Sequence, residues 1–398
     1  MNKEMKKVPT VRFKGFADDW EQRKLGDIVD FLDTQRKPLT ENIREKGPYP
    51  YYGASGIVDY VAGYIFDEEL VLLSEDGANI TDRNYPVCFL ASGKYWVNNH
   101  AHVLKTKEGI DNNFICNSLE CKDFSIYNTG MAMPKLNQDI CKRIPVDFPT
   151  YDEQEKIGNY FRDIDYFITL HQRKLDQLQT LKKYFLQNMF PTKGEKVPAI
   201  RFKGFTGDWE QRKLDDVVAS FEYGLNAAAK DYDGKNKYLR ITDIDDSTHE
   251  FLKENLTSPD TDISETGNYK LQEGDVLFAR TGASVGKTYI YKESDGLVFY
   301  AGFLIRAKIK KDYNPEFIFQ NTLTPNYDKY IRITSQRSGQ PGVNAREYGE
   351  YTLMVPSLLE QRKIGKCLRN LDNLITLHQR KCDQLQSLKK FMLQNLFI

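Results

Sequence analysis

The chain has 398 residues, and at about 150 residues per domain this length predicts two or three domains. Its 56 Lys and Arg residues balance its 56 Asp and Glu residues, which excludes a protein that binds polyanions through bulk positive charge. An aromatic fraction of 13% is typical of packed domains and excludes a largely disordered chain. Any surface that binds nucleic acid must therefore be local.

Targeting signals and cysteine patterns point to the cytoplasm. No apolar run approaches the roughly 18 residues that a transmembrane helix needs, and no apolar run follows the N-terminal lysines as it would in a secretory signal. The six cysteines are scattered without a Cys-x-x-Cys pair, which favours free thiols over disulfides or a zinc site. We expect a cytoplasmic protein without a membrane contact or a bound metal.

The N-terminal segment occurs twice in the chain. Residues 8–29 read VPTVRFKGFADDWEQRKLGDIV, and residues 197–218 read VPAIRFKGFTGDWEQRKLDDVV, with sixteen of the 22 positions identical. A period of this size indicates an internal duplication.

The stretches that follow each copy, 30–133 and 219–340, show almost no similarity to each other. Alternating apolar residues predict strands in both, at 52–66, 69–80 and 95–107 in the first and at 236–244, 275–291 and 296–309 in the second. Short helices are expected near their ends, at 112–128 and 315–331. Three anchors survive at matching places: Pro134, Asn137 and Pro149 correspond to Pro341, Asn344 and Pro356. Simple drift after duplication would not leave some blocks nearly intact beside unrecognisable ones, so we favour two different recognition domains on one symmetric frame.

Polar loops with small residues follow the predicted strands. SEDGANITDR (74–83) and ARTGASVGK (279–287) each place Gly-Ala after an apolar strand, and YNTGMAMPKLN (127–137) and TSQRSGQPGVN (334–344) each precede an anchoring proline. Glycine lets a backbone approach a ligand closely, and Ser, Asn, Thr, Arg and Lys donate to phosphates and base edges. Each loop alone is also compatible with an ordinary solvated turn, but their recurrence in both halves favours a binding role.

No catalytic constellation emerges from the sequence. GASVGKT (282–288) has three residues between its glycines where a phosphate-binding loop has four, and a strand is predicted after it. His100 and His102 are a possible metal pair, but without a third ligand nearby a structural use is favoured. Glu120-Cys-Lys122 has the spacing of half a nuclease motif, a pattern common by chance. The sequence contains neither the motif with which amino-methyltransferases bind the target amine nor a glycine-rich turn suited to a nucleotide cofactor.

A second repeat predicts two long helices. Residues 153–190 and 360–397 are identical at 25 of 38 positions and contain no proline. Their apolar residues are spaced alternately by three and four, which is the pattern of a coiled-coil seam, and periodicity alone leaves the helix direction open. His171 and His378 occupy the same seam position, and a polar register mark is favoured over a metal or pH-sensitive pair. The seam residues are Ile157, Phe161, Ile164, Ile168, Leu175, Leu178, Ile364, Leu368, Leu371, Ile375 and Leu385.

The repeated VPxxRFKGFxxDWEQRKL segment, the run from Pro-x-[LV]-Asn through EQxKI into a long helix, and the duplicated layout resemble the specificity subunit of a type I restriction–modification system. The resemblance covers essentially the whole chain. It implies two target recognition domains that each read half of a split DNA sequence, and an antiparallel coiled coil that spaces them. It further implies two modification subunits that carry S-adenosylmethionine and methylate adenine N6, and two restriction subunits that use ATP and Mg for translocation and cleavage. The present chain would then be a non-catalytic reader of double-stranded DNA that binds no cofactor itself.

The expected fold class is α+β, with two strand-rich mixed α/β recognition domains in a pseudo-twofold arrangement. Domain boundaries are expected at 1–150 and 191–355 for the recognition domains, and at 151–190 and 356–398 for the spacer helices. A self-contained methyltransferase or nuclease is the alternative enzyme, and a structural coiled-coil adaptor is the alternative without DNA. The candidate DNA contacts are Ser74, Asn79, Thr81, Arg83, Asn99, His100, Thr129, Lys135, Arg280, Thr281, Ser284, Lys287, Arg337, Ser338 and Gln340.

Overall fold

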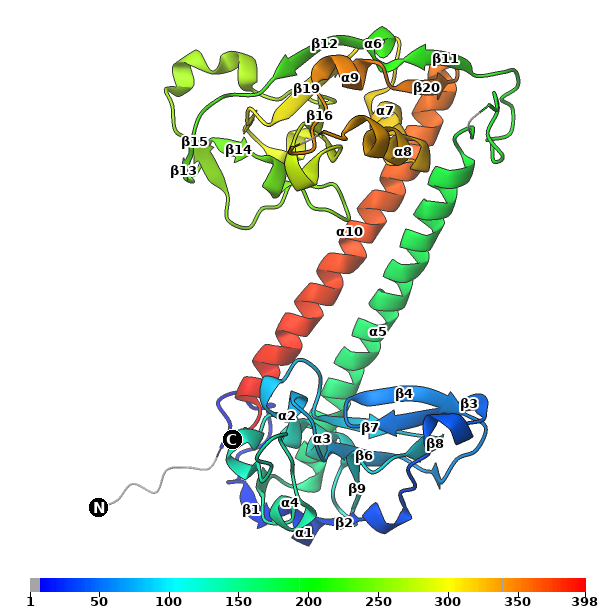
Figure 1. Cartoon of the computed structure of the whole chain (residues 1–398). Coiled ribbons are helices and arrows are strands. Elements are labelled where there is room, and N and C mark those ends of the chain that lie inside the picture. Colours follow the sequence, from blue (N-terminus) through cyan, green and yellow to red (C-terminus); the bar gives the residue numbers. More distant parts are fainter. Residues whose placement is uncertain (1–7, 193, 338) are drawn as a thin grey trace. The chain divides into compact units, whose positions relative to one another are not determined.

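A computed structural model describes residues 8–192, 194–337 and 339–398. The chain divides into two compact units (Figure 1). The first contains the chain up to His171 together with Lys381–Ile398, and the second contains Gln172–Arg380. Each unit therefore includes one divergent domain and a half of each long helix, and each combines helices with sheets as expected for an α+β fold.

The first unit is built around a four-stranded antiparallel sheet with the order β2-β9-β6-β7. Its central strand β6 (Leu70–Ser74) is buried along its whole length, because alternate side chains face two different layers. Val71 and Leu73 pack with helix α3 (Asn112–Glu120), whereas Leu70 and Leu72 pack toward the second sheet, β4-β3-β8-β5. The other strands of the two sheets are β2 (Val29–Phe31), β3 (Lys46–Gly53), β4 (Gly56–Val61), β5 (Phe66–Asp67), β7 (Cys88–Ala91), β8 (Lys94–Val97) and β9 (Ala101–Thr106).

The second unit repeats this sheet with the order β12-β19-β16-β17. Helices α7 (Pro315–Asn321) and α8 (Pro325–Thr334) follow β19, as the sequence predicted, and their apolar residues join the same core as the sheet. The remaining strands form two small pairs, β13-β15 and a parallel β14-β18. The strand bounds are β12 (Val218–Tyr223), β13 (Ala229–Asp231), β14 (Lys237–Leu239), β15 (Thr257–Pro259), β16 (Val276–Ala279), β17 (Thr288–Ile290), β18 (Val298–Tyr300) and β19 (Leu304–Ile309).

The repeated N-terminal segments form the same substructure in each unit. Strand β1 (Glu21–Lys24) pairs with β10 (Pro145–Phe148), and β11 (Glu210–Lys213) pairs with β20 (Thr352–Val355). A buried ion pair accompanies each: Arg12 lies 2.7 Å from Glu153, and Arg201 lies 2.8 Å from Glu360. The duplication seen in sequence is thus a duplication of tertiary contacts.

The two long helices are α5 (Tyr151–Asn188) and α10 (Leu358–Asn395). In the first unit Lys389, late in α10, contacts Asp165, early in α5; in the second unit Lys182, late in α5, contacts Asp372, early in α10. An early residue of one helix meets a late residue of the other in both units, so the helices run antiparallel. The predicted seam is confirmed, since all eleven of its residues are buried except the half-buried Ile168 and Leu385. The role of His171 and His378 as register marks stays a prediction.

A phenylalanine just after each long helix packs into the core of one unit. Phe397, just after α10, packs against Trp20, Phe114 and Phe161 in the first unit. Phe190, just after α5, packs in the same way against Trp209 and Phe317 in the second. Among the described helices, none has an apolar stretch that would cross a membrane.

Candidate nucleic-acid interface

Two polar loops of the first unit lie against each other at the end of β6. The amide of Gly77 donates to the carbonyl of Pro134 at 3.0 Å, and the amide of Leu136 donates to the carbonyl of Glu75 at 2.7 Å. Gly77 has φ +110°, a conformation that side chains other than glycine rarely adopt. The sequence identified both loops as candidates, and the structure adds that they form one surface.

The second unit contains the same pair of loops. The amide of Gly282 donates to the carbonyl of Pro341 at 3.0 Å, and the amide of Val343 donates to the carbonyl of Arg280 at 2.9 Å. Gly282 again has positive φ, at +73°. The shared glycine and proline anchors of the two halves were the sequence signal for this pairing.

The side chains on this common scaffold differ between the units. Glu75 and Asp76 of the first unit stand where the second unit has Arg280 and Thr281. The first domain therefore has two carboxylates at these positions, both paired within the unit, and the second has a guanidinium and a hydroxyl. Two scaffolds of the same backbone structure with different side chains suit the recognition of two different ligands.

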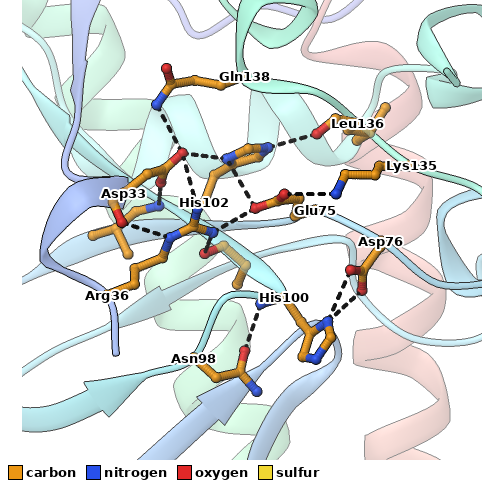
Figure 2. Close-up of polar contacts among 12 residues, drawn as sticks. Asp33, Arg36, Glu75, Asp76, Asn98, His100, His102, Lys135, Leu136 and Gln138 are labelled. Carbon is orange, nitrogen blue, oxygen red and sulfur yellow. Dashed lines mark hydrogen bonds and ion pairs between the residues drawn. The ribbon is translucent and has the colours of Figure 1, made fainter. Parts of the chain in front are cut away.

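A network of charged residues supports the paired loops of the first unit (Figure 2). The buried imidazole of His102 contacts the carboxylate of Asp33 at 2.6 Å and donates to the carbonyl of Leu136 at 2.7 Å. Arg36 bridges Glu75 at 2.6 Å and Asp33 at 3.5 Å, and Lys135 lies 3.3 Å from Glu75. The network therefore connects β9, the segment after β2 and both polar loops.

The interactions of His102 and Asp33 determine the electrostatic character of this network. Burial alone would lower the pKa of His102, but its interactions with Asp33 and Cys141 together outweigh burial and raise the pKa to about 10. Burial alone would raise the pKa of Asp33, but its interactions with His102, the amide of Val103 and Arg36 together lower it. Ligand atoms of Asp33, Glu75 and His102 lie within 4.8 Å of one another, a spacing that suits a metal ion. Both carboxylates contact the His102 imidazole or the Arg36 guanidinium, so the residues form an ion-pair network in this structure.

His100 and His102 are used separately. His100 is exposed in the turn before β9 and contacts Asp76 at 2.9 Å, away from the buried network (Figure 2). The structural use of this pair stays a prediction.

Several candidates of the first unit hold their own loop together. The side-chain amide of Asn79 donates to the carbonyl of Tyr85 at 2.9 Å, and the hydroxyl of Thr81 donates to the carbonyl of Ala78 at 3.0 Å. Arg83 pairs with Glu120 at 2.9 Å. Ser74 is buried and its hydroxyl donates to the carbonyl of Val87, which corrects its assignment as a contact residue. The candidates that remain at the surface of this unit are Asn79, Thr81, Arg83, Asn99, His100, Thr129 and Lys135.

In the second unit Lys287 is also used internally. Its ammonium group donates to the carbonyl of Ile244 at 2.9 Å and pairs with Asp246, and only 12% of its side chain is exposed. Its assignment as a charged contact is corrected accordingly. Arg280 lies over the ring of Tyr223 at 5.1 Å, and Arg337 pairs with Glu347. Arg280, Thr281, Ser284, Arg337 and Gln340 remain candidates, and Ser338 lies outside the described residues.

The motifs rejected from sequence have structural explanations. Gly282–Ser284 form a short 3-10 turn and strand β17 follows, so the segment lacks the helix of a phosphate-binding loop. Glu120 accepts the amides of Val87 and Cys88 at 2.9 Å each, and burial raises its pKa. Glu120 is therefore a positioning group for the segment before β7.

Sequence reasoning missed two exposed methionines between the polar residues of the second loop. Met131 and Met133 are 105% and 56% exposed. The pattern GMAMP was visible, but only the structure shows that neither side chain joins a core.

Comparison with known proteins connects this architecture to one family. The model described as "Type I restriction modification DNA specificity domain" matches residues 17–180 and again 206–387. The chain is 22% identical to the type I restriction enzyme MjaVIII specificity subunit of Methanocaldococcus jannaschii, over 94% of this chain and 91% of that protein. A stretch of 137 residues is 36% identical to a Haemophilus influenzae protein named as a type I restriction enzyme specificity subunit, covering 34% of this chain and 35% of that relative.

A solved structure has the same fold. The crystal structure of the type I restriction-modification system S subunit from M. genitalium superposes with a TM-score of 0.74, covering 98% of this chain and 99% of that one at 15% sequence identity. The two matches to the family model span most of the chain and fall one on each recognition domain with its adjoining helix, and they show that the chain belongs to the type I restriction-modification DNA specificity family.

Proposed function

We propose that each domain of this specificity subunit reads one half of a bipartite double-stranded DNA target through its paired loops, and that the chain itself catalyses no reaction. The observation that carries the proposal is the shared scaffold with different side chains, Glu75 and Asp76 in one unit and Arg280 and Thr281 in the other. Base edges are distinguished by their donor and acceptor patterns, so different side chains on one scaffold select different bases. A chain that acts on chromosomal DNA would work in the cytoplasm.

Repeated apolar surfaces on the long helices support the proposed partners. In the first unit Phe167, Leu170, Leu388 and Phe391 are between 40% and 53% exposed. The equivalent residues of the second unit are equally exposed, and they are Leu374, Leu377, Leu181 and Tyr184. Exposed apolar residues at repeated positions are typical of interaction sites. Two equivalent surfaces suit two copies of one partner, which we assign as the modification subunits.

We assign the cofactors to the partner subunits, because the chain itself is proposed to catalyse no reaction. S-adenosylmethionine would belong to the two modification subunits, and ATP and Mg to two restriction subunits. Purified specificity chain is expected to transfer no label from S-adenosylmethionine to DNA, whereas the complex with modification subunits does. Methyl transfer by the chain alone at the rate of the complex would overturn this assignment.

Methylation mapping tests the recognition proposal. Residues 30–150 are exchanged for those of a relative with a different target, and methylated adenines are located by single-molecule sequencing. We expect one half of the target to change and the other to remain. A simultaneous change of both halves would show that the domains do not read independently.

Native mass spectrometry of the complex tests the partner surfaces. The unaltered chain is expected to bind two modification subunits, and Phe391→Glu is expected to bind only one. Gln386→Glu adds the same charge at an exposed polar position of the same helix and should leave two copies bound. Two copies bound to Phe391→Glu would exclude this surface.

A further inference from the structure

Residues 128–135 of the first unit, here called the methionine loop, expose an apolar tip. Met131 is 105% exposed and Met133 is 56% exposed, with Ala132 between them also exposed. The side chains from Gly130 to Met133 carry no hydrogen-bond donor. A ligand of this tip is therefore recognised through apolar contact.

The loop is closed at its base by several hydrogen bonds. The side-chain oxygen of Asn128 accepts the amides of Gly130 and Lys135, each at 2.9 Å. The amide and hydroxyl of Thr129 both donate to the carbonyl of Lys135, at 2.8 and 3.0 Å. A Cβ atom on Gly130 would lie 1.8 Å from the carbonyl oxygen of Met133, so this fold of the loop requires glycine. The tip is thus presented by an ordered frame.

The methionine loop is continuous with the candidate DNA surface. Pro134, next to the tip, accepts the amide of Gly77 from the loop after β6. Lys135 at the base of the methionine loop is paired with Glu75, which belongs to the loop after β6. Counted from the matching prolines Pro134 and Pro341, the second unit has Ser338 and Gln340 in place of Met131 and Met133. The two units therefore differ in whether this position offers apolar or polar side chains.

We propose that Met131 selects a thymine in the first half-site by packing against its C5-methyl group in the major groove, an inference that rests on the proposed function. The thymine methyl is the one apolar feature among the base edges of the major groove. An unbranched thioether side chain adapts its shape to such a group. Met133 supplies a second, less exposed apolar contact beside it.

Uracil substitution tests the inference in the full complex with modification subunits. Each thymine of the mapped first half-site is replaced in turn by uracil, which removes only the methyl group, and duplex affinity is measured for the unaltered chain and for Met131→Ala. We expect one position at which uracil weakens binding to the unaltered chain by about fourfold, as for one buried methyl group. At that position Met131→Ala should lose a similar factor on thymine DNA and less than about twofold further on uracil DNA.

Three further variants serve as controls for this result. Met131→Leu retains an apolar side chain and is expected to keep most of the discrimination. Gly130→Ala displaces the tip and is expected to reproduce the Met131→Ala result. Gln336→Ala lies in the other domain and should show no coupling to uracil in the first half-site. Unchanged thermal unfolding of Met131→Ala identifies the loss as one of contact.

Several outcomes would overturn the inference. Equal losses on thymine and uracil DNA would place the loop at the duplex without methyl recognition, and no loss on either would remove the loop from the interface. Increased fluorescence of 2-aminopurine beside the loop would indicate a wedge between base steps instead. Failure of the proposed function is distinct, because the unaltered complex would then bind its mapped target no more tightly than a scrambled duplex.

Discussion

Lys389 and Asp165 lie 2.6 Å apart, and the equivalent pair Lys182 and Asp372 has the same separation of 2.6 Å. Both lysines interrupt the apolar seam of a long helix, and both find their carboxylate on the other helix. The duplicated ion pair occurs once in each unit. It favours the antiparallel register, because a shift of one helix would separate each lysine from its carboxylate.

The two ion pairs should contribute unequally to stability. Asp372 is 14% exposed and also accepts the side-chain amide of Gln320 at 2.7 Å, whereas Asp165 is 49% exposed. We expect Asp372→Asn to lower the free energy of unfolding by about 1–3 kcal/mol and Asp165→Asn by less than about 1 kcal/mol, because solvent weakens the exposed pair. Denaturant unfolding of the two variants measures the difference, and equal losses would argue against it.

The pH dependence of stability should reveal the His102–Asp33 contact. The pKa of His102 is about 10 in the folded protein, above its ordinary value of 6.5. A raised folded-state pKa gives a stabilisation that is complete below about pH 6.5 and is lost as pH rises through about 10. Between those limits stability should fall by up to about 1.4 kcal/mol per pH unit from this group.

The control for this prediction is His102→Gln, which keeps a donor but does not titrate. Its unfolding free energy should depend less steeply on pH across the same window. A decline of the same slope in the variant would assign the pH dependence to other groups.

Replacing either of two helix glycines by alanine should lower the stability of the protein. Gly158 of α5 and Gly365 of α10 abut the N-caps of α3 and α7, and an added Cβ would lie 2.2 Å from Asp111 Oδ1 and 2.7 Å from Asn314 Oδ1. Alanine in a helix interior is normally favoured over glycine by about 1 kcal/mol. We expect Gly158→Ala to destabilise despite that preference, and Gly365→Ala to do so less, as judged by thermal unfolding. Stabilisation by Gly158→Ala would mean that α3 moves aside freely.

Arg280 and Lys287 should respond differently to alanine substitution. The guanidinium of Arg280 lies over the ring of Tyr223, where the two polar loops meet. The ammonium group of Lys287 instead donates to the carbonyl of Ile244 and pairs with Asp246. Arg280→Ala is expected to weaken DNA binding by about 1–3 kcal/mol if it contacts a base, with relaxed specificity in the second half-site only. Lys287→Ala should chiefly lower stability. Affinities measured on matched and mismatched duplexes separate these outcomes, and an unchanged Arg280→Ala would remove it from the interface.

The sequence alone predicted the organisation of the fold. The 3-4 spacing of apolar residues predicted the seam, because a long helix must bury such a stripe. The repeats predicted two equivalent frames, and most of the predicted strands and short helices were found where expected, although Asn79–Asp82 is helical and 236–244 contains only the short strand Lys237–Leu239. These features were predictable because they depend on neighbours in the chain or on residues duplicated intact.

Only the tertiary structure decided how the candidate site is assembled. Asp33, Glu75, His102 and Lys135 come from four separate segments, and no local pattern indicates that their charges meet. Lys287 had the sequence context of a free cation, yet the distant Asp246 pairs with it. Periodicity left the helix direction open, and the contacts of Lys389 and Lys182 decided it. The physical reason is that a side chain's partners are set by which segments pack together, and packing depends on the whole chain.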